Sequence, residues 1–138
     1  MRVLCLDVGD KRIGFAISDP NRKIAQALTL YERQSPKADI EKIKMLVKEH
    51  GVSTIVLGLP KNLDGSIGTR GQDVESFAKK IEVSTGLPVD LWDERFTTNE
   101  AHRIFDMASV KRKKRKPFID MMAAQLILQG YLDAQADT

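Results

Sequence analysis

The first 30 residues of the chain alternate apolar runs with short polar turns, a pattern that predicts β-strands. Apolar runs over residues 2–9 and 12–18 meet at residues 9–11, a connection too short for a parallel crossover. The two runs are therefore expected to pair as an antiparallel hairpin. A weaker strand over 23–30 follows a second turn and is expected at an edge of the sheet.

The rest of the chain alternates helical and strand patterns. Apolar residues at helical spacing, ended by glycines, predict helices, and short apolar runs predict strands. The expected helices span 37–50, 70–85, about 97–108 and 117–134, and the expected strands span 53–58 and 88–94. The order βββ-α-β-α-β-α-α predicts an α/β protein with a mixed five-stranded sheet and helices on both faces. The strands at 2–9, 53–58 and 88–94 are expected to be parallel and central, with a site where the first two end.

Length and composition narrow the class of protein. A chain of 138 residues with 42% hydrophobic and 30% charged residues is expected to fold as one globular domain, residues 1–138. Cys5 is the only cysteine, and its apolar setting predicts a reduced thiol in the core. No signal peptide precedes the first strand, and no segment approaches the roughly 18 apolar residues of a membrane span. We therefore expect a cytoplasmic protein with no membrane partner.

The net charge of +3 hides a local basic run. Six consecutive cations form it: Lys111, Arg112, Lys113, Lys114, Arg115 and Lys116. Without these six, 16 of the 22 basic residues remain against 19 acidic residues, a balance of −3. A concentrated basic patch predicts an anionic partner, and nucleic acid is the first candidate. The alternative is that the run is an ordinary solvated loop.

Carboxylates occupy apolar settings at three places in the predicted fold. Asp7 interrupts the apolar first strand, where an isolated charge is costly and a positive partner is expected nearby. Asp93 or Glu94 ends the strand at 88–94; these neighbours point to opposite faces, and alternation does not choose between them. Asp120 lies in the first turn of the last helix, on the apolar stripe that faces the core.

Acids gathered at one place form a site for hard divalent cations, here Mg²⁺ or Mn²⁺. Two such ions would activate a water molecule and stabilise the leaving oxygen of a phosphodiester. Lys11 and Arg12 border Asp7. Arg70 lies in the glycine-containing loop before the second helix, and the basic run precedes the last helix. These cations are expected to hold the phosphate backbone. Ordinary ion pairs, such as Asp7 with Arg12 or Arg95, are the alternative.

Four segments that follow one another along nearly the whole chain carry a family resemblance. They are Asp7–Gly14, Gly58–Gly65, Asp93–Thr97 and Asp120–Leu128. In order and spacing they closely resemble the signatures of the YqgF/RuvX family of bacterial proteins. The resemblance implies an RNase H-like fold, and it implies that Asp7, Glu94 and Asp120 are the catalytic, metal-binding acids, with Glu94 chosen over Asp93. Members are described as Holliday-junction resolvases and as nucleases that mature the 5′ end of the small-subunit ribosomal RNA precursor.

The sequence therefore predicts a metal-dependent endonuclease that hydrolyses phosphodiester bonds in structured nucleic acid. The first candidate role is processing of the 5′ end of pre-16S rRNA in ribosome biogenesis, with ribosomal precursor particles as partners. The second candidate role is cleavage of Holliday-junction DNA. A non-catalytic module that binds nucleic acid or the ribosome is the alternative of another class. A phosphotransferase of the actin-like ATPase type needs two such domains, and 138 residues supply one. The choices between RNA and DNA, one and two ions, and monomer and homodimer stay open.

Overall fold

The computed structural model describes residues 1–62, 64–93 and 116–136, and in the last segment it describes the side chains of 122–135. The strands are β1 (Arg2–Val8), β2 (Arg12–Ser18), β3 (Ala25–Glu32), β4 (Val52–Leu59) and β5 (Val89–Asp93). The helices are α1 (Pro36–His50), α2 (Thr69–Thr85) and α4 (Lys116–Ala136). None of these helices is both long and apolar enough to cross a membrane. The helix expected at about 97–108 lies outside the described residues.

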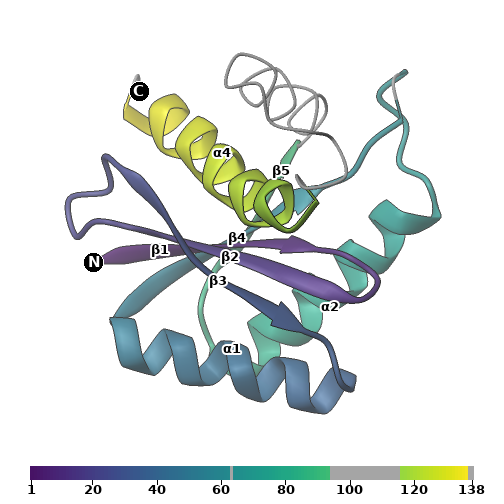
Figure 1. Cartoon of the computed structure of the whole chain (residues 1–138), viewed down its shortest axis with the longest axis horizontal. Helices are drawn as coiled ribbons and strands as arrows, with labels where there is room; N and C mark the ends of the chain where they lie inside the picture. The colour runs from purple at the N-terminus through teal and green to yellow at the C-terminus, as the bar shows by residue number, and fades with distance from the viewer. Residues whose placement is uncertain (63, 94–115, 137–138) are drawn as a thin grey trace.

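The strands form one sheet in the order β3-β2-β1-β4-β5. β1 and β2 pair as an antiparallel hairpin, β3 is the edge strand beside β2, and β1, β4 and β5 are parallel, as predicted. Helices α1 and α2 cover one face and α4 covers the other (Figure 1). The prediction that the strand at 88–94 is central is wrong, because β5 forms the second edge. Its sequence, Val-Asp-Leu-Trp-Asp, includes two acids and none of its side chains is fully buried, whereas a strand covered on both faces is apolar throughout.

The sheet divides the core into two layers because successive strand residues point to opposite faces. On β1, Leu4 and Leu6 face α1 and α2, whereas Val3 and Cys5 face α4. All four side chains are fully buried, which confirms that β1 is covered on both faces and that Cys5 is a core thiol. Burial of each large aliphatic side chain contributes roughly 1.5–3 kcal/mol, so this double cover holds β1 at the centre.

Asp19 decides where β3 begins. Its Oδ1 accepts hydrogen bonds from the backbone amides of Lys23 (2.7 Å) and Ile24 (2.9 Å), and both residues stay in the turn. The strand predicted at 23–30 is therefore displaced to Ala25–Glu32. The amide of Ile24, followed by that of Lys23, lowers the pKa of Asp19 below its ordinary value.

Two glutamines attach α4 to the start of β3. Nε2 of Gln125 donates a 3.2 Å hydrogen bond to the carbonyl of Ala25, whose own amide donates to Oε1 of Gln129 at 2.9 Å. Nε2 of Gln129 donates to the carbonyl of Lys23 at 3.0 Å. The later glutamine, Gln129, reaches back to the earlier residue, Lys23, so α4 runs antiparallel to β3. The first turns of α4 therefore lie toward the end of the sheet at which β1 finishes (Figure 1).

Tyr131 attaches α4 to the opposite edge strand. Its hydroxyl donates a 2.5 Å hydrogen bond to Oδ2 of Asp90 and accepts one of 2.9 Å from Nε2 of Gln135. The ring meets Trp92 edge to face, with 5.6 Å between the ring centres. Burial, followed by the neighbouring Asp90 carboxylate, raises the pKa of Tyr131 to about 12.

The variant Tyr131→Phe tests this attachment. At neutral pH its free energy of unfolding should be lower by about 1–2 kcal/mol, since one hydrogen bond to a carboxylate is lost while the ring is kept. The pKa rises from an ordinary 10 to about 12 in the folded protein. The stability that Tyr131 adds is therefore complete below pH 10 and is lost as the pH rises through 12. Urea denaturation at a series of pH values should show the wild-type advantage shrinking above pH 10; an advantage that stays constant contradicts this account.

Candidate active site

A cleft of about 430 Å³ opens where β1 ends and turns into β2. Its lining residues are Asp7, Gly9, Asp10, Lys11, Arg12, Gly14 and Arg70. All but the last belong to the β1–β2 hairpin, whereas Arg70 comes from the first turn of α2. One continuous segment and one distant side chain thus form the site.

Asp7 lies on the α4 side of the sheet, at the point where the burial of β1 stops. Val3 and Cys5 pack into the core on that side, and alternation places Asp7 with them. Its register partner on β2 is Gly14, and Arg12 lies two residues earlier on the same face. Gly14 and Arg12 line the cleft together with Asp7.

The structure brings three predicted phosphate-binding cations to Asp7. Lys11 and Arg12 enter the cleft from the hairpin, and Arg70 enters it from α2. The positive charge expected near Asp7 is therefore present. Nearby opposite charge offsets part of the cost of taking a carboxylate out of water. The binding of phosphate by these cations stays a prediction.

The other predicted site residues are described only in part. Glu94 and residues 111–115 lie outside the described residues. Asp120 and Lys116 belong to the first turns of α4, where only the backbone is described. Because α4 runs antiparallel to β3, these turns lie toward the end of the sheet that carries Asp7.

Asp93 does not share a face with Asp7. Its neighbour Trp92 packs against the α4-side core, so Asp93 points to the opposite face of β5. Its Oδ2 lies 3.9 Å from Nζ of Lys61, which belongs to the loop after β4. Asp93 therefore does not share a site with Asp7. Strand alternation in the sequence alone had left this question open.

The donor chemistry of the described part fits a hard divalent cation. Asp7 supplies carboxylate oxygens beside an open cleft, and Asp10 lines the same cleft from the turn. No three potential metal ligands come together among the side chains that the structure describes. Of the predicted trio, only the side chain of Asp7 is described, so the complete ligand set stays a prediction.

Close packing at the start of α2 positions Arg70. A Cβ atom on Gly71 would lie 2.5 Å from Cγ2 of Ile67 and 2.9 Å from the carbonyl oxygen of Pro60. Glycine is therefore required for the helix to approach the loop after β4 this closely. Arg70 immediately precedes Gly71, so the direction in which the Arg70 side chain leaves the helix depends on this close contact.

Sequence analysis missed a buried ion pair behind the cleft. Asp39, in the first turn of α1, is only 1% exposed, and its Oδ2 accepts a 2.9 Å hydrogen bond from Nε of Arg33. An acid in the first turn of a helix usually faces water. Asp39 however precedes the buried Ile43 and Leu46 by four and seven residues, which is the spacing of a buried stripe and was the available signal.

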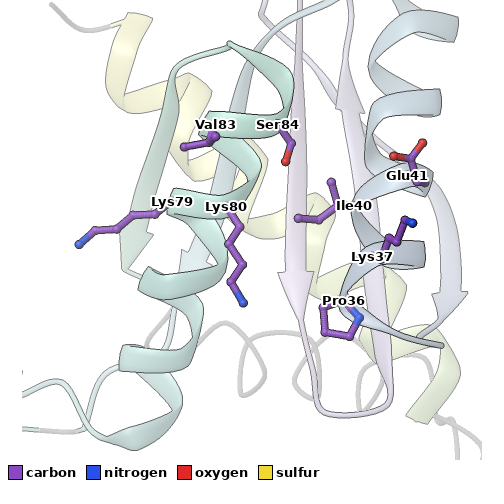
Figure 2. Close-up of a pocket in the computed structure, with 8 residues that line it drawn as sticks. All are labelled: Pro36, Lys37, Ile40, Glu41, Lys79, Lys80, Val83 and Ser84. Atoms are coloured by element: carbon purple, nitrogen blue, oxygen red, sulfur yellow. The ribbon is translucent and has the colours of Figure 1, made fainter.

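A second hollow, of about 540 Å³, lies between α1 and α2. Figure 2 shows Ile40 and Lys37 on the α1 side and Lys80 on the α2 side. The lining combines aliphatic side chains with lysines, and its one acid is Glu41. Such a surface has no grouped carboxylates for a metal ion, so we place the candidate active site in the cleft at Asp7.

The fold is RNase H-like. Over 100% of this chain and 97% of the other, it is similar to T. thermophilus RuvC in complex with a Holliday junction substrate, with a TM-score of 0.62 at 12% identity. Over 98% of this chain and 99% of the other, it is similar to fowlpox virus resolvase in complex with Holliday junction DNA, again with a TM-score of 0.62 at 12% identity. At this identity the similarity establishes the fold alone.

The chain belongs to the RuvX family. Residues 1–134 match the family model, which is described as "Holliday junction resolvase". A protein of Halalkalibacterium halodurans named "Putative pre-16S rRNA nuclease" is 53% identical over 137 residues, which cover 98% of each chain. A protein of the same name from Thermoanaerobacter pseudethanolicus is 50% identical over 136 residues, again 98% of each chain. The resemblance found in the four sequence segments is thus confirmed.

The packing at the start of α2 is tested by Gly71→Ala. The added methyl group overlaps Ile67 and the backbone of Pro60, so the free energy of unfolding should fall by about 1–3 kcal/mol. Gly130→Ala is the matched control, since a Cβ there meets Nε1 of Trp92 at 3.4 Å inside a helix. It should change stability by less than about 1 kcal/mol. Urea denaturation measures both variants, and equal effects would contradict the packing argument.

Proposed function

We propose that this protein is a metal-dependent endonuclease that hydrolyses phosphodiester bonds in structured nucleic acid, with the 5′ end of pre-16S rRNA as its first substrate. One observation carries the proposal: the Asp7 carboxylate shares a single cleft with the cations of Lys11, Arg12 and Arg70. A metal-dependent nuclease needs this combination. An acid holds a cation at the reacting phosphate, while basic side chains hold the backbone on either side.

The relatives support RNA as the substrate. The proteins at 53% and 50% identity carry a name that specifies pre-16S rRNA, and the match covers 98% of their length. We infer that the single domain 1–138 carries the whole activity. Ribosomal precursor particles are then its partners, and the cytoplasm is its location.

We assign Asp7, Glu94 and Asp120 as the catalytic acids that bind Mg²⁺ or Mn²⁺. Two placements support this set besides Asp7 itself. The first turns of α4, which carry Asp120, extend toward the end of the sheet at which β1 finishes. Asp93 faces away and contacts Lys61, which leaves Glu94 as the acid from this segment. A divalent ion bound there supplies charge that stabilises the transition state at phosphorus and lowers the pKa of a water molecule.

The cations divide the work of holding the substrate. Lys11, Arg12 and Arg70 border the acid and are assigned to the phosphates next to the scissile bond. The basic run, residues 111–116, leads into the helix that carries Asp120, with Lys116 as its first residue, and is assigned to more distant phosphates. Contacts of this kind supply affinity and register without reading base sequence. The enzyme is therefore expected to recognise the shape of its substrate.

Holliday-junction DNA is the second candidate substrate. The family model is described as a resolvase, and the same cleft chemistry serves either nucleic acid. Resolution of a four-way junction needs two cuts related by symmetry and therefore a homodimer, whereas processing of an RNA end is compatible with a monomer. A non-catalytic module is the rival of another class, and it predicts binding without cleavage.

Asp7→Asn tests the enzyme. Cleavage of a pre-16S rRNA fragment and of a four-way DNA junction should fall by about a thousandfold or more, because an amide is a poor ligand for Mg²⁺ or Mn²⁺. Calorimetry should show weakened Mn²⁺ binding, and circular dichroism should show an unchanged fold. Glu41→Gln removes an exposed acid from the hollow between α1 and α2 and should cleave as the wild type does. Full activity in Asp7→Asn contradicts the proposal. If the wild-type protein binds both substrates but cleaves neither of them, the non-catalytic module is favoured.

Arg70→Ala tests the cationic wall of the cleft. Affinity for the RNA fragment should fall by about tenfold at low salt, and the salt dependence of binding should decrease by about one phosphate contact. Lys80→Ala removes a cation from the same helix at the hollow between α1 and α2 (Figure 2), and it should leave affinity and salt dependence unchanged. Fluorescence anisotropy at several salt concentrations measures both variants. Equal losses in the two variants would mean that binding depends on overall charge and not on the cleft.

A further inference from the structure

Arg33, in the loop after β3, holds the turn that forms one wall of the cleft. Its backbone amide donates a 2.8 Å hydrogen bond to the carbonyl of Lys11. Its Nη1 donates a 3.0 Å hydrogen bond to the carbonyl of Gly9. These two carbonyls flank Asp10, so one residue holds both sides of the tip of the turn. The amide of Gly9 also donates to the carbonyl of Arg12 at 2.8 Å, which closes the turn.

Arg33 is itself held by both helices on that face of the sheet. Its Nε donates to Oδ2 of Asp39 in α1, and its guanidinium carbon lies 5.2 Å from the centre of the Phe77 ring in α2. The second oxygen of Asp39 accepts a 3.1 Å hydrogen bond from the amide of Gln34. An almost fully buried acid with both oxygens bonded is a rigid anchor for the guanidinium.

Arg33 does not line the cleft. It lines an adjoining hollow of about 220 Å³, which shares Gly9, Asp10 and Arg70 with the cleft. A residue behind the turn acts on a ligand in the cleft through the position of the turn and not by contact.

We propose that Arg33, anchored by Asp39, is a positioning residue that fixes Lys11 and Arg12 for nucleic-acid binding. The identity of the ligand rests on the proposed function. Lys11 is exposed, and an exposed turn that is not tied down samples many conformations. Holding the turn in one conformation before binding removes that ordering cost from the binding step.

A lysine at position 33 separates positioning from folding. The planar guanidinium donates to Asp39 and to the carbonyl of Gly9 in two directions, whereas an ammonium group is a single point. Arg33→Lys keeps a positive charge beside the buried Asp39, so the fold is preserved. It gives up the bond to Gly9, so the turn is loosened.

Arg22 provides a matched control at the opposite end of the sheet, in the turn between β2 and β3. Its Nη2 donates to Oγ of Ser53 at 2.7 Å and to Oγ1 of Thr54 at 3.2 Å. Arg22→Lys therefore disturbs a comparable arginine bridge without touching the cleft.

The experiment measures binding of a fluorescein-labelled pre-16S rRNA fragment by anisotropy, in EDTA so that no cleavage occurs. Arg33→Lys should bind about tenfold more weakly than the wild type, and Arg22→Lys should bind within about twofold of it. Hydrogen exchange at the amides of Gly9 and Arg33 should be about tenfold faster in Arg33→Lys, while the melting temperature confirms the fold. In the background Lys11→Ala with Arg12→Ala, Arg33→Lys should have almost no further effect on affinity, because it acts through those two side chains.

Three outcomes overturn the role. Wild-type affinity in Arg33→Lys despite faster exchange shows that the turn does not need to be held. A loss of affinity that persists undiminished in the Lys11→Ala, Arg12→Ala background shows that Arg33 acts by another route. A wild-type protein that binds neither the RNA fragment nor a four-way DNA junction overturns the proposed function and this role with it, whereas the first two outcomes leave the proposed function standing.

Discussion

Burial of β1 on both faces is the constraint on which the site depends. A strand covered from both sides has no face for a polar residue, so a carboxylate is tolerated only where the cover ends. Asp7 occupies this limit, one residue beyond the fully buried Leu6. Parallel pairing with β4 and antiparallel pairing with β2 bring the loop after β4 and the hairpin turn to the same end of the sheet. The cleft is thus a consequence of topology, and its chemistry depends on which side chains the turn carries.

The two faces of the sheet contribute differently to this end. On one face, α1 and α2 hold the hairpin turn from behind through Asp39 and Phe77. On the other face, α4 crosses the sheet with its first turns toward the end at which β1 finishes (Figure 1). The layer of α1 and α2 therefore supports the hairpin turn from behind and also contributes Arg70 to the cleft wall.

Sequence patterns located every described helix and strand to within two residues. The spacing of apolar residues within each segment indicates which side chains are buried, and this spacing differs between helices and strands. They failed where the direction of one side chain depends on tertiary contacts. Asp39 lies on the buried stripe of α1, where Arg33 pairs with its charge, and Asp93 is turned away because Trp92 packs into the core on the α4 side. Of the candidate site, Asp7 and its neighbouring cations followed from local pattern, whereas the choice of Glu94 came from family resemblance.

The attachment of α4 to β3 has a consequence for tolerance of mutation. Gln125 and Gln129 bond to main-chain atoms of Lys23 and Ala25, groups that every residue except proline provides at both positions. Replacement of the Lys23 side chain therefore leaves these hydrogen bonds in place, while loss of either glutamine removes its share of them. Substitution is accordingly tolerated at Lys23, in the turn before β3, whereas a change at Gln125 or Gln129 removes hydrogen bonds from the same interface.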